Sequence, residues 1–402
     1  MSHEKSKFSL FQKEKQFLIA LSRTCIDQTL ETYILTSVQS GLNWEKLYSL
    51  ALSNGVLPLA FKSLNRCCAG LIPKDVFKKF KASARKTAII NLSMSSILFK
   101  LLTVLNQNNI IAVPFKGPLL AHSVYGDLSL RSFGDLDVLV NTFDVSQAYT
   151  LLTKVGYEPE IQLSSSQIIQ FIKTEDNISF KQSGTGVIVE LHWELSGNYL
   201  PKALTLNIVQ LRIVKDDFHK HTVLTLGNED LLIYLCIHGS KHIWHRLEWI
   251  CCVNELITNN SKLNWTLVLQ LADEWSARRM LAIGLLLTEE LFDTSIPEEI
   301  LDRMSKDKKA NEMAFLIVSM YMEKNSRDKA TCFGNRFAFW QLGCVETVRG
   351  KIRLFVAMSF FPTIEDWRRM PLPAQLSFLY WFLRPMRLIF EVLKRIFSWK
   401  KF

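Results

Sequence analysis

The sequence lacks several features that define whole classes of protein. Its 402 residues contain no internal repeat, no low-complexity tract and no collagen-like or disordered composition. The first residues, MSHEKSKFSLFQKEKQF, are too polar for a secretory signal peptide, and no run of 18 or more uncharged apolar residues predicts a transmembrane helix. Since 48% of the residues are hydrophobic, we expect a cytoplasmic protein with a substantial core and two or three lobes.

The cysteines form no recognisable metal-binding pattern. Eight are scattered along the chain, and no pair has the CxxC spacing of a zinc site. Without a secretory signal, we expect their thiols to be reduced. The doublets Cys67-Cys68 and Cys251-Cys252 are therefore interpreted as small buried hydrophobes rather than as redox or metal sites.

The net charge of +10 permits an anionic partner such as a nucleotide, RNA or a membrane surface. Part of this excess lies in the C-terminal stretch RPMRLIFEVLKRIFSWKKF, so charge alone does not predict nucleic-acid binding along the whole chain. The tail from Gln375 to Phe402 suits an interfacial helix on anionic lipid, because it mixes apolar residues with arginine and lysine. We favour the alternative, a helix packed on a helical lobe with its basic side in solvent, because Pro385 interrupts the amphipathic pattern.

Hydrophobic periodicity divides the chain into three regions. Residues 1–108 place apolar residues at three- and four-residue spacing, which predicts an N-terminal helical region. Residues 109–222 alternate short β-branched segments with helical ones, which predicts a compact α/β core; NISFKQ and VIVELHW are expected to form a hairpin. Residues 223–402 predict a C-terminal helical domain, interrupted by a linker-like stretch at 323–335.

The segment RSFGDLDVLV places two acids in a strand. Side chains at i and i+2 share a face, so Asp135 and Asp137 converge while Leu136 and Val138 face the core. Two carboxylates about 4 Å apart repel by roughly 4 kcal/mol at an effective dielectric near 20, which a bound cation would relieve. Glu190 completes a three-carboxylate site for Mg²⁺ or Mn²⁺ if its strand lies alongside. Protection of an exposed strand edge is the alternative, and it explains one acid better than three.

Candidate phosphate contacts precede the acidic strand. A predicted strand ends in Lys116-Gly117 and runs directly into a helix. Such a junction exposes backbone N–H groups and a helix N-terminus to an anion, and Lys116 can add its charge. Arg131 is a further candidate for phosphate contact, with a solvated loop arginine as the equal alternative.

These motifs together resemble the DNA polymerase β-like nucleotidyltransferase superfamily, and most closely a poorly characterised bacterial group of nucleotidyltransferase family proteins. The resemblance is carried by FKGPLL (115–120), RSFGDLDVLV (131–140), VELHWEL (189–195), HGSKHIWHRLEW (238–249) and LPAQLSFLYWFLRPMRL (372–388). It implies an α+β or α/β fold, with a polymerase β-like core of a small mixed sheet and flanking helices between N-terminal and C-terminal helical regions.

The resemblance also implies roles for the candidate residues in Mg²⁺- or Mn²⁺-dependent transfer of a nucleoside monophosphate from an NTP, ATP included. Asp135 and Asp137 would bind both metal ions, and Glu190 would bind the nucleophile-side ion and help deprotonate the acceptor. Lys116 and Gly117 would hold the β- and γ-phosphates.

Two positions depart from the pattern of that superfamily. Pro118 follows Gly117 and removes a backbone donor, so the hold on the triphosphate differs from the usual one. Cys252 stands where the bacterial group leads us to expect an acid, which would matter if that acid oriented the nucleotide.

The segment HGSKHIWHRLEW places His238 and His242 on one helical face. Their HxxxH spacing suggests zinc, but neither an HExxH motif nor a partner acid accompanies it, so zinc is not expected. Lys241 and Arg246 on or near that face favour a triphosphate- or acceptor-binding surface, to which His192 can contribute. A helix whose polar side merely packs on the α/β core is equally compatible.

Three functions remain compatible with the sequence. The first, which we favour, is nucleotidyl transfer to a small molecule or biosynthetic intermediate by a two-metal carboxylate mechanism. The second is the same chemistry on a macromolecule, either tRNA or a protein. The third is a catalytically silent binding or scaffold protein with this fold, against which the intact set of three acids argues. A closed pocket would favour the first function, and a basic groove would favour the second.

Overall fold

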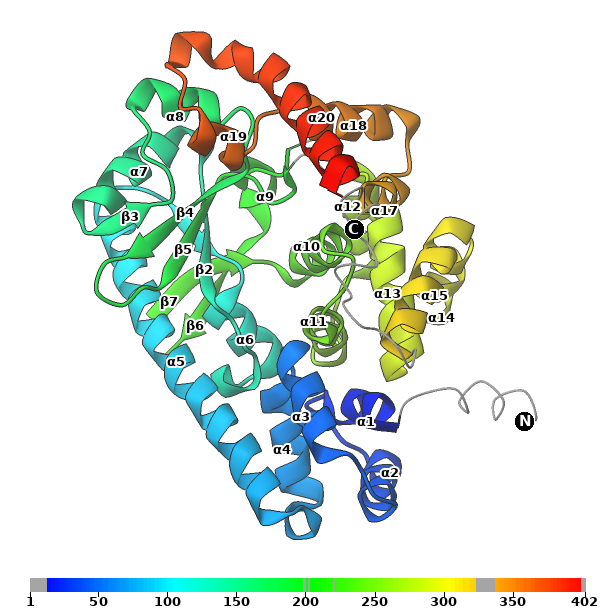
Figure 1. Cartoon of the computed structure of the whole chain (residues 1–402). Coiled ribbons are helices and arrows are strands. Elements are labelled where there is room, and N and C mark those ends of the chain that lie inside the picture. The colour runs from blue at the N-terminus through cyan, green and yellow to red at the C-terminus, as the bar shows by residue number, and fades with distance from the viewer. Residues whose placement is uncertain (1–12, 198–199, 202, 220, 323–336, 399–402) are drawn as a thin grey trace.

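A computed structural model describes residues 13–197, 200–201, 203–219, 221–322 and 337–398, without the side chains of 337 and 395–398. Figure 1 shows the sheet and its helices on the left, helices α10 and α11 in the centre and α13 to α15 on the right. Helices α1 to α4 lie below, and α18 to α20 lie above. The predicted linker at 323–335 and Cys332 lie outside the described residues.

The N-terminal region is helical, as predicted. Its elements are α1 (Lys13–Leu21), α2 (Gln28–Gln39), α3 (Trp44–Ser53), α4 (Leu57–Cys67), the 3-10 turn η2 (Ala69–Leu71) and the long α5 (Lys74–Gln107). Polar side chains set where some of these helices begin: Asp27 caps α2, and Asn43 caps α3. The C-terminal half of α5 shares a hydrophobic cluster with the sheet.

The core of the fold is a five-stranded mixed sheet in the order β1-β2-β5-β4-β3. Its strands are β1 (Ala112–Pro114), β2 (Asp135–Val140), β3 (Tyr157–Pro159), β4 (Asn177–Gln182) and β5 (Ile188–His192). Strands β2 and β5 are parallel, while β4 and β5 form the predicted antiparallel hairpin. The elements between them are α6 (Gly117–Tyr125), η3 (Leu128–Leu130), η4 (Thr142–Asp144), α7 (Val145–Lys154) and α8 (Ser165–Phe171). The predicted small mixed sheet with flanking helices is confirmed.

The two faces of this sheet have different surroundings. Leu136 and Val138 of β2 point into a cluster with α5, α7 and α8, as the alternation predicts. The opposite face carries Asp135, Asp137 and Glu190 and turns toward α10 (Asn228–Lys241). The alternation of apolar and acidic residues therefore places the candidate site between the sheet and the C-terminal helices.

A second sheet was not predicted. Strands β6 (Ile213–Phe218) and β7 (His221–Leu226) form a two-stranded antiparallel hairpin after α9 (Leu206–Val209) and η6 (Gln210–Arg212). The charged sequence VKDDF hides this strand, because only one of its faces is buried. The hairpin packs beside β1, where the Thr225 hydroxyl donates to the carbonyl of Pro114 at 3.2 Å.

The rest of the described chain is helical. Its elements are α11 (Leu247–Thr258), α12 (Trp265–Glu274), α13 (Arg278–Phe292), α14 (Glu298–Ser305), α15 (Lys308–Met322), α17 (Phe337–Cys344), α18 (Val348–Phe360), α19 (Ile364–Arg369), η7 (Ala374–Leu379) and α20 (Tyr380–Ser398). The five buried cysteines are unpaired, in agreement with the sequence: Cys68, Cys236, Cys251, Cys252 and Cys344. Of the doublets that were expected to be buried, only Cys67 departs, because it is half-buried; Cys25 is unpaired and exposed.

The orientation of the last helix, α20 (Tyr380–Ser398), is opposite to the predicted one. Pro385 sits inside α20 without ending it, and the helix turns its apolar side outward. Arg384 and Arg387 lie on the inner side and bind the buried Asp366. The predicted packing, with the basic side in solvent, is wrong because these ion pairs hold the polar side against the protein.

One helix, α5, is long and apolar enough to cross a membrane by length and composition, and 39% of its most apolar stretch is buried. The sequence-based expectation rested on a stricter test, an unbroken run of 18 uncharged apolar residues, which α5 does not contain. The most apolar stretch of α5 contains one charged residue, Lys100, and its uncharged polar residues still leave its mean hydropathy high. One side of α5 packs on the sheet through Leu98 and Leu101, as in the core helix of a globular domain.

The HGSKHIW motif is partly structural. Trp244 is fully buried between α10 and α13. Its backbone has a φ of 50°, in the left-handed region, within the turn that follows α10. A methyl group on Gly239 would lie 2.5 Å from the Trp244 ring, which leaves no room for any other residue. The carbonyl of Trp244 accepts a hydrogen bond from the Tyr321 hydroxyl, so the indole has little freedom to move.

We expect Gly239→Ala to lower the free energy of unfolding by about 2 kcal/mol, because a well-packed indole must shift to admit the methyl group. Thermal unfolding measures this loss. Gly70→Ala is the matched control, since nothing lies within 4 Å of the added carbon there. Equal unfolding temperatures for the two variants would contradict the tight packing around Trp244.

Candidate active site

The acidic residues are aligned by strand register. In the parallel pair of β2 and β5, Asp137 lies directly opposite Glu190, and Asp135 lies opposite Ile188. Neighbouring strands are about 4.8 Å apart, so side chains in register on one face touch. The predicted neighbourhood of the two acidic strands is thus present, and Asp137 and Glu190 form its centre.

Asp137 is the buried anchor of the group. Its Oδ1 accepts hydrogen bonds from Lys116 Nζ at 2.8 Å and lies 3.2 Å from His192 Nε2. Burial alone would raise the pKa of Asp137, but the charges of Lys116 and His192 hold it well below its usual range. Its second oxygen, Oδ2, is buried without a hydrogen-bond partner among the described residues. A buried, ionised carboxylate oxygen of this kind requires a cationic or donor partner.

His192 belongs to the same group. Its Nε2 lies 3.2 Å from both Asp137 Oδ1 and Glu190 Oε2. Burial lowers the pKa of His192, but hydrogen bonds to the two carboxylates outweigh burial and raise the pKa to about 8. Phe115, at the end of β1, fixes the imidazole by edge-on contact at 5.2 Å between ring centroids.

A divalent cation fits these residues. The ligand atoms of Asp137, Glu190 and His192 all lie within 4.8 Å of one another, and Asp137 Oδ2 has capacity to spare. The compact set therefore contains His192 in place of the predicted Asp135. Asp135 lies one strand step away on the same face, where burial and the neighbouring Asp137 raise its pKa to about 6. A cation near Asp135 would relieve this repulsion.

A cavity of about 470 Å³ opens over these carboxylates, in the size range of small-molecule sites. It gathers residues from β2, β4, β5, α10 and the start of α11. The predicted site residues in its lining are Lys116, Arg131, Asp135, Glu190, His192, His238, Lys241, His242 and Arg246. Residues that the sequence places more than 100 positions apart thus share one cavity, although their individual roles remain predictions.

Gly117 occupies a different place from the predicted one. It is buried at φ 55°, and a side-chain carbon would approach the carbonyl of Asp135 to 3.2 Å. It is not among the residues that line the cavity, and Pro118 follows it in the first turn of α6. The glycine lets the chain turn closely past β2, while Lys116 alone reaches the carboxylates from this junction.

Arg131 is neither a solvated loop residue nor free to move. Its guanidinium is buried and lies 3.1 Å from Glu248, which also pairs with Arg246 at 2.8 Å. Asn91 donates to the carbonyl of Arg131 at 2.8 Å and fixes the loop. Cys252, one turn after Glu248, is buried, accepts a hydrogen bond from the Tyr125 hydroxyl and does not line the cavity. In this chain Glu248 supplies the acid beside Arg131.

An aromatic wall closes one side of the cavity. The Trp249 ring contacts the rings of His238 and His242 at 5.4 and 5.3 Å between centroids. Burial lowers the pKa of His238 well below its usual value, and burial together with Lys241 lowers the pKa of His242 to about 4. Both imidazoles are therefore neutral at pH 7. They offer stacking and hydrogen bonds rather than charge, while Lys241 and Arg246 supply the cations.

Ten lining residues were not among the predicted site residues, and they include Asp176, Tyr234, Glu248 and Trp249. Asp176 pairs with Lys241 at 3.4 Å, and the Tyr234 ring lies 5.6 Å from Lys116 Nζ. Tyr234 precedes His238 by one helical turn, a spacing that could have identified it. Asp176 lies in a loop, where no periodicity signals its direction.

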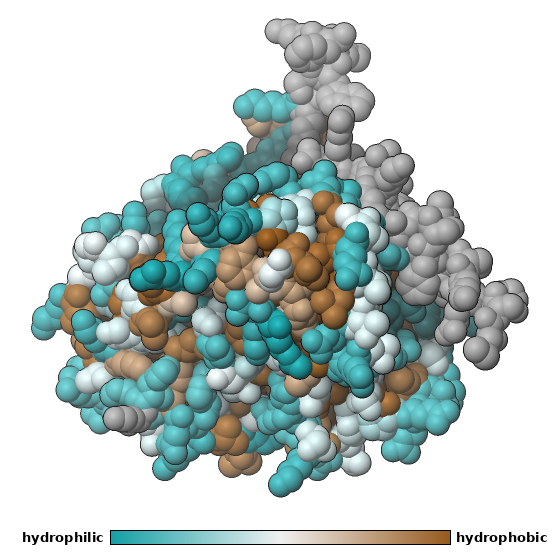
Figure 2. Space-filling model, turned by 90° about the horizontal axis from the view of Figure 1, so that it is seen from below, coloured by the Kyte–Doolittle hydropathy of each residue, from teal (hydrophilic) through white to brown (hydrophobic). Residues whose placement is uncertain are grey.

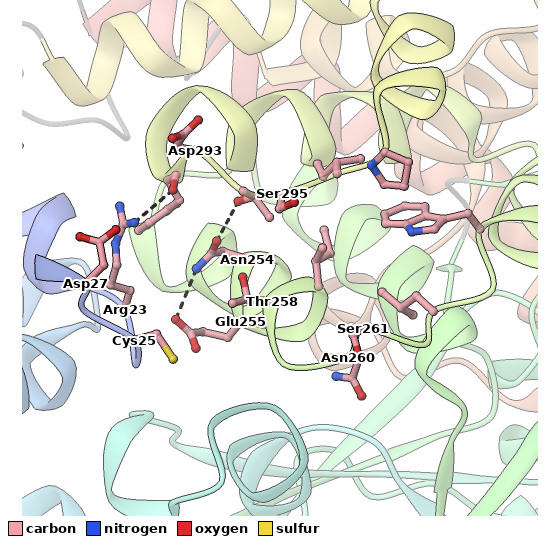
Figure 3. A pocket seen from close by; sticks show the side chains of 17 residues that line it. Arg23, Cys25, Asp27, Asn254, Glu255, Thr258, Asn260, Ser261, Asp293 and Ser295 are labelled. Atoms are coloured by element: carbon pink, nitrogen blue, oxygen red, sulfur yellow. Dashed lines mark hydrogen bonds between the residues drawn. The ribbon is translucent and has the colours of Figure 1, made fainter. Parts of the chain in front are cut away.

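A larger cavity of about 630 Å³ lies between the α1–α2 loop and the ends of α11 and α13 (Figure 3). Its polar groups are occupied in holding these elements together. Glu255 accepts from the backbone of Thr24 at 2.9 Å, and Asn254 accepts from the Thr294 hydroxyl at 2.7 Å. Arg23 donates to the carbonyl of Phe292 at 3.1 Å. The smaller cavity is the candidate active site, because Asp135 and Glu190 line it and the buried Asp137, with its unsatisfied oxygen, lies in register with Glu190.

A family model described as "Uncharacterised nucleotidyltransferase" matches residues 40–293, which is more than half of the chain. This range includes every lining residue of the candidate site, but it ends before the LPAQLSFLYWFLRPMRL motif. A search of curated proteins finds no match.

Solved structures with similarity to the chain include three described as follows. The lincosamide antibiotic adenylyltransferase LnuA, with lincomycin bound, is 12% identical with a TM-score of 0.26, over 34% of this chain and 82% of that one. The antibiotic-resistance factor ANT(2'')-Ia is 9% identical with a TM-score of 0.35, over 47% and 94%. An antigenic nucleotidyltransferase-like protein from Paracoccidioides brasiliensis is 13% identical with a TM-score of 0.25, over 52% and 96%. Because these TM-scores are low, the assignment of the chain to a family rests on the family model and not on the solved structures.

Proposed function

Because the chain belongs to the uncharacterised nucleotidyltransferase family, we propose that it transfers a nucleoside monophosphate from an NTP to a small acceptor molecule in the 470 Å³ cavity. The acceptor oxygen attacks the α-phosphorus, the bond from that phosphorus to the bridging oxygen breaks, and pyrophosphate leaves. The observation that carries the proposal is Asp137, a buried ionised carboxylate in register with Glu190 and with one oxygen unsatisfied.

Mg²⁺ or Mn²⁺ is the proposed cofactor, held by Asp137 and Glu190 with Asp135 and His192 adjacent. When bound, such an ion neutralises the phosphate charge that develops during transfer. The charges of the residues around the cavity support the need for a bound cation. Its lining has four basic residues (Lys116, Arg131, Lys241 and Arg246) and four acidic ones (Asp135, Asp176, Glu190 and Glu248), with Asp137 beneath them. These side chains leave no surplus of positive charge for a triphosphate.

The chain's own residues divide the remaining work. Lys116 fixes Asp137 and keeps it ionised, and the unpaired Oδ2 of Asp137 would be available to hold a cation. Glu190, with a side chain 28% exposed, reaches the cavity and accepts the acceptor's proton. Lys241 and Arg246 line the cavity opposite the sheet, where they can hold phosphate oxygens. His238 and Trp249 offer faces for stacking a base or an acceptor ring.

A small acceptor suits this site better than a macromolecule. The cavity is bounded by the sheet, α10 and the start of α11, and its charges balance. A groove for nucleic acid would carry a continuous excess of positive charge. Transfer to tRNA or a protein is therefore the second candidate, and a labelled-acceptor assay separates the two.

Nucleotide binding tests the proposal without knowledge of the acceptor. We expect an NTP to raise the thermal unfolding temperature when Mg²⁺ or Mn²⁺ is present, and much less in EDTA. Lys241→Met should weaken this binding about tenfold, because a charged phosphate contact is lost. The exposed Lys154→Met is the control. If no NTP binds the folded protein with either metal, the proposed function is wrong.

A further inference from the structure

Helix α20 carries an apolar face that the rest of the described chain leaves uncovered. We define the α20 apolar face as seven large residues with exposures of 43 to 66%: Trp381, Phe382, Met386, Ile389, Phe390, Val392 and Leu393. Residues 382, 386, 389, 390 and 393 recur at the three- and four-residue spacing of one helical face. The neighbouring helix α18 adds Val348, Ile352 and Phe355, which are 58 to 72% exposed.

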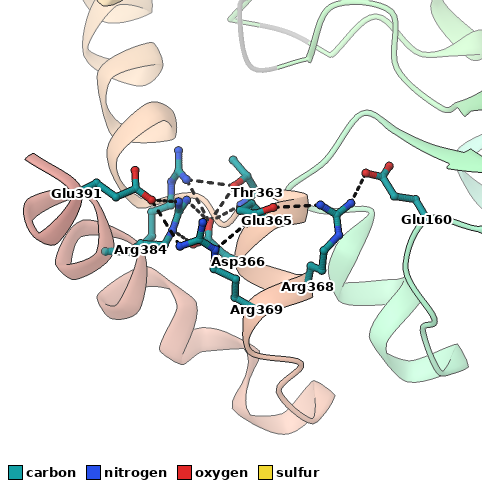
Figure 4. A network of polar contacts seen from close by, with 9 residues as sticks. Glu160, Thr363, Glu365, Asp366, Arg368, Arg369, Arg384 and Glu391 are labelled. Atoms are coloured by element: carbon teal, nitrogen blue, oxygen red, sulfur yellow. Dashed lines mark hydrogen bonds and ion pairs between the residues drawn. The ribbon is translucent and has the colours of Figure 1, made fainter. Parts of the chain in front are cut away.

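The outward direction of this face is fixed by its polar side. Arg387 Nε donates to Asp366 Oδ1 at 2.5 Å, and Arg384 Nη1 donates to Asp366 Oδ2 at 3.2 Å (Figure 4). Asp366 also accepts from the backbone N–H and the hydroxyl of Thr363. Arg387 further pairs with Glu391 at 2.7 Å on the same helix. To bury its apolar face on this protein, α20 would have to break these contacts.

The charge around the face has one dominant sign. Helix α20 has four basic residues and one acidic residue, and α18 has three basic residues and no acidic one, so each carries a net charge of +3. Arg384 and Arg387 of α20 lie on its inner side and pair with Asp366, so the described basic residues beside the apolar face are Lys394 of α20 and those of α18. Arg349 and Arg353 are exposed on α18, and Lys394 lies over the Phe390 ring at 5.3 Å, at the border of the apolar face. Basic residues that flank an apolar helix face match an anionic lipid surface.

Other exposed apolar residues are less well matched to such a surface. Helix α5 is more basic, with seven basic residues and one acidic one, but only three of its large apolar residues are exposed: Ile89, Ile90 and Leu92. The end of the molecule seen in Figure 2 shows hydrophobic residues gathered among hydrophilic ones. At this end lie α2, α3, α4 and the start of α5, where the large exposed apolar residues before α5 are scattered along the sequence: Tyr33, Leu52 and Leu71. Among the described helices, only α20 combines a full helical face of exposed apolar residues with flanking basic residues.

We propose that the α20 apolar face docks in the plane of an anionic membrane surface, with Arg349 and Arg353 of α18 and Lys394 of α20 at the headgroups. This docking does not depend on the proposed catalytic activity.

Flotation of the full chain with lipid vesicles tests the proposal. We expect binding to phosphatidylcholine vesicles that contain one third phosphatidylserine, weaker binding at high salt, and little binding to pure phosphatidylcholine. The double variant Phe382→Ser, Phe390→Ser should weaken partitioning on the order of a hundredfold, since each ring contributes about tenfold. Both side chains are mainly exposed, so the fold should be retained, and thermal unfolding checks this.

Two control variants sharpen the result. Phe143→Ser with Phe315→Ser removes two rings that are 86% and 73% exposed elsewhere, and vesicle binding should not change. Lys81→Glu with Arg85→Glu alters the α5 surface and should also leave binding unchanged. The proposal is overturned if anionic vesicles do not bind the protein, or if the α5 variant alone abolishes binding. It is equally overturned if the α20 variant merely dissociates a dimer in solution and the wild type does not bind vesicles.

Discussion

Glu190→Gln is expected to lower the initial rate of pyrophosphate release on the order of a thousandfold. The amide preserves the shape of the side chain but removes both the negative charge for a metal ion and the capacity to accept a proton. Since the Glu190 side chain is 28% exposed and lies at the cavity, the folded state should tolerate the change. The rate is measured with saturating NTP and Mg²⁺, and unfolding temperature is measured in parallel.

Asp137→Asn should be at least as damaging to the rate, but with a second effect. The substitution leaves Lys116 buried beside a neutral amide, so the free energy of unfolding should also fall. Comparison of the two variants therefore separates loss of chemistry from loss of stability. Glu158→Gln, an exposed carboxylate on β3, is the control and should retain full activity. Wild-type rates in Glu190→Gln would remove that residue from the mechanism.

Asp366→Ala is expected to weaken the attachment of α20 by about 2–4 kcal/mol, because two arginines lose a shared, nearly buried partner. The loss is local, so limited proteolysis within residues 364–394 should detect it more sensitively than global unfolding. Asp302→Ala, on an exposed turn of α14, is the control. Unchanged protease resistance would show that Asp366 does not hold the helix.

The lowered pKa of Asp366 predicts that the attachment of α20 depends on pH. Although burial opposes the shift, hydrogen bonds from Arg387 and Thr363 lower the pKa of Asp366 below its ordinary value. An acid with a lowered pKa stabilises the folded state above its unfolded pKa, and this contribution disappears as the pH falls through the folded pKa. The difference in protease resistance between wild type and Asp366→Ala should therefore be full above about pH 4 and shrink below it.

The centre of the candidate site was predictable because strand geometry has a strict period. Two acids at i and i+2 must share a face, and a third acid in a later apolar strand needs only the adjacent pairing that β2 and β5 show. The contacts of His192 with Asp137 and Glu190 follow from the same alternation. The register of β2 and β5 therefore explains why the sequence could predict which acidic residues are neighbours.

Other features depend on tertiary choices that periodicity does not encode. The apolar residues of an amphipathic helix such as α20 have the same spacing whether they face inward or outward. The ion pairs with Asp366 determine which side of α20 faces the protein. Asp366 lies 18 residues before Arg384, outside the helix whose orientation it determines. Likewise, Gly117 is typical of a phosphate loop, but its close packing against Asp135 depends on how α6 leaves the sheet. Glu248 and Cys252, one helical turn apart, both approach Arg131, but only Glu248 offers it a carboxylate.

Transfer of label tests the central claim most directly. The full chain is incubated with each α-labelled NTP, Mg²⁺ or Mn²⁺ and a fractionated cell extract, with Glu190→Gln in parallel. The account predicts that one NTP labels a small-molecule product in a metal-dependent reaction, with one pyrophosphate released per label and with no label transferred by the variant. Label transfer that is equal in wild type and Glu190→Gln, or the absence of transfer and pyrophosphate release with all four NTPs, would contradict it.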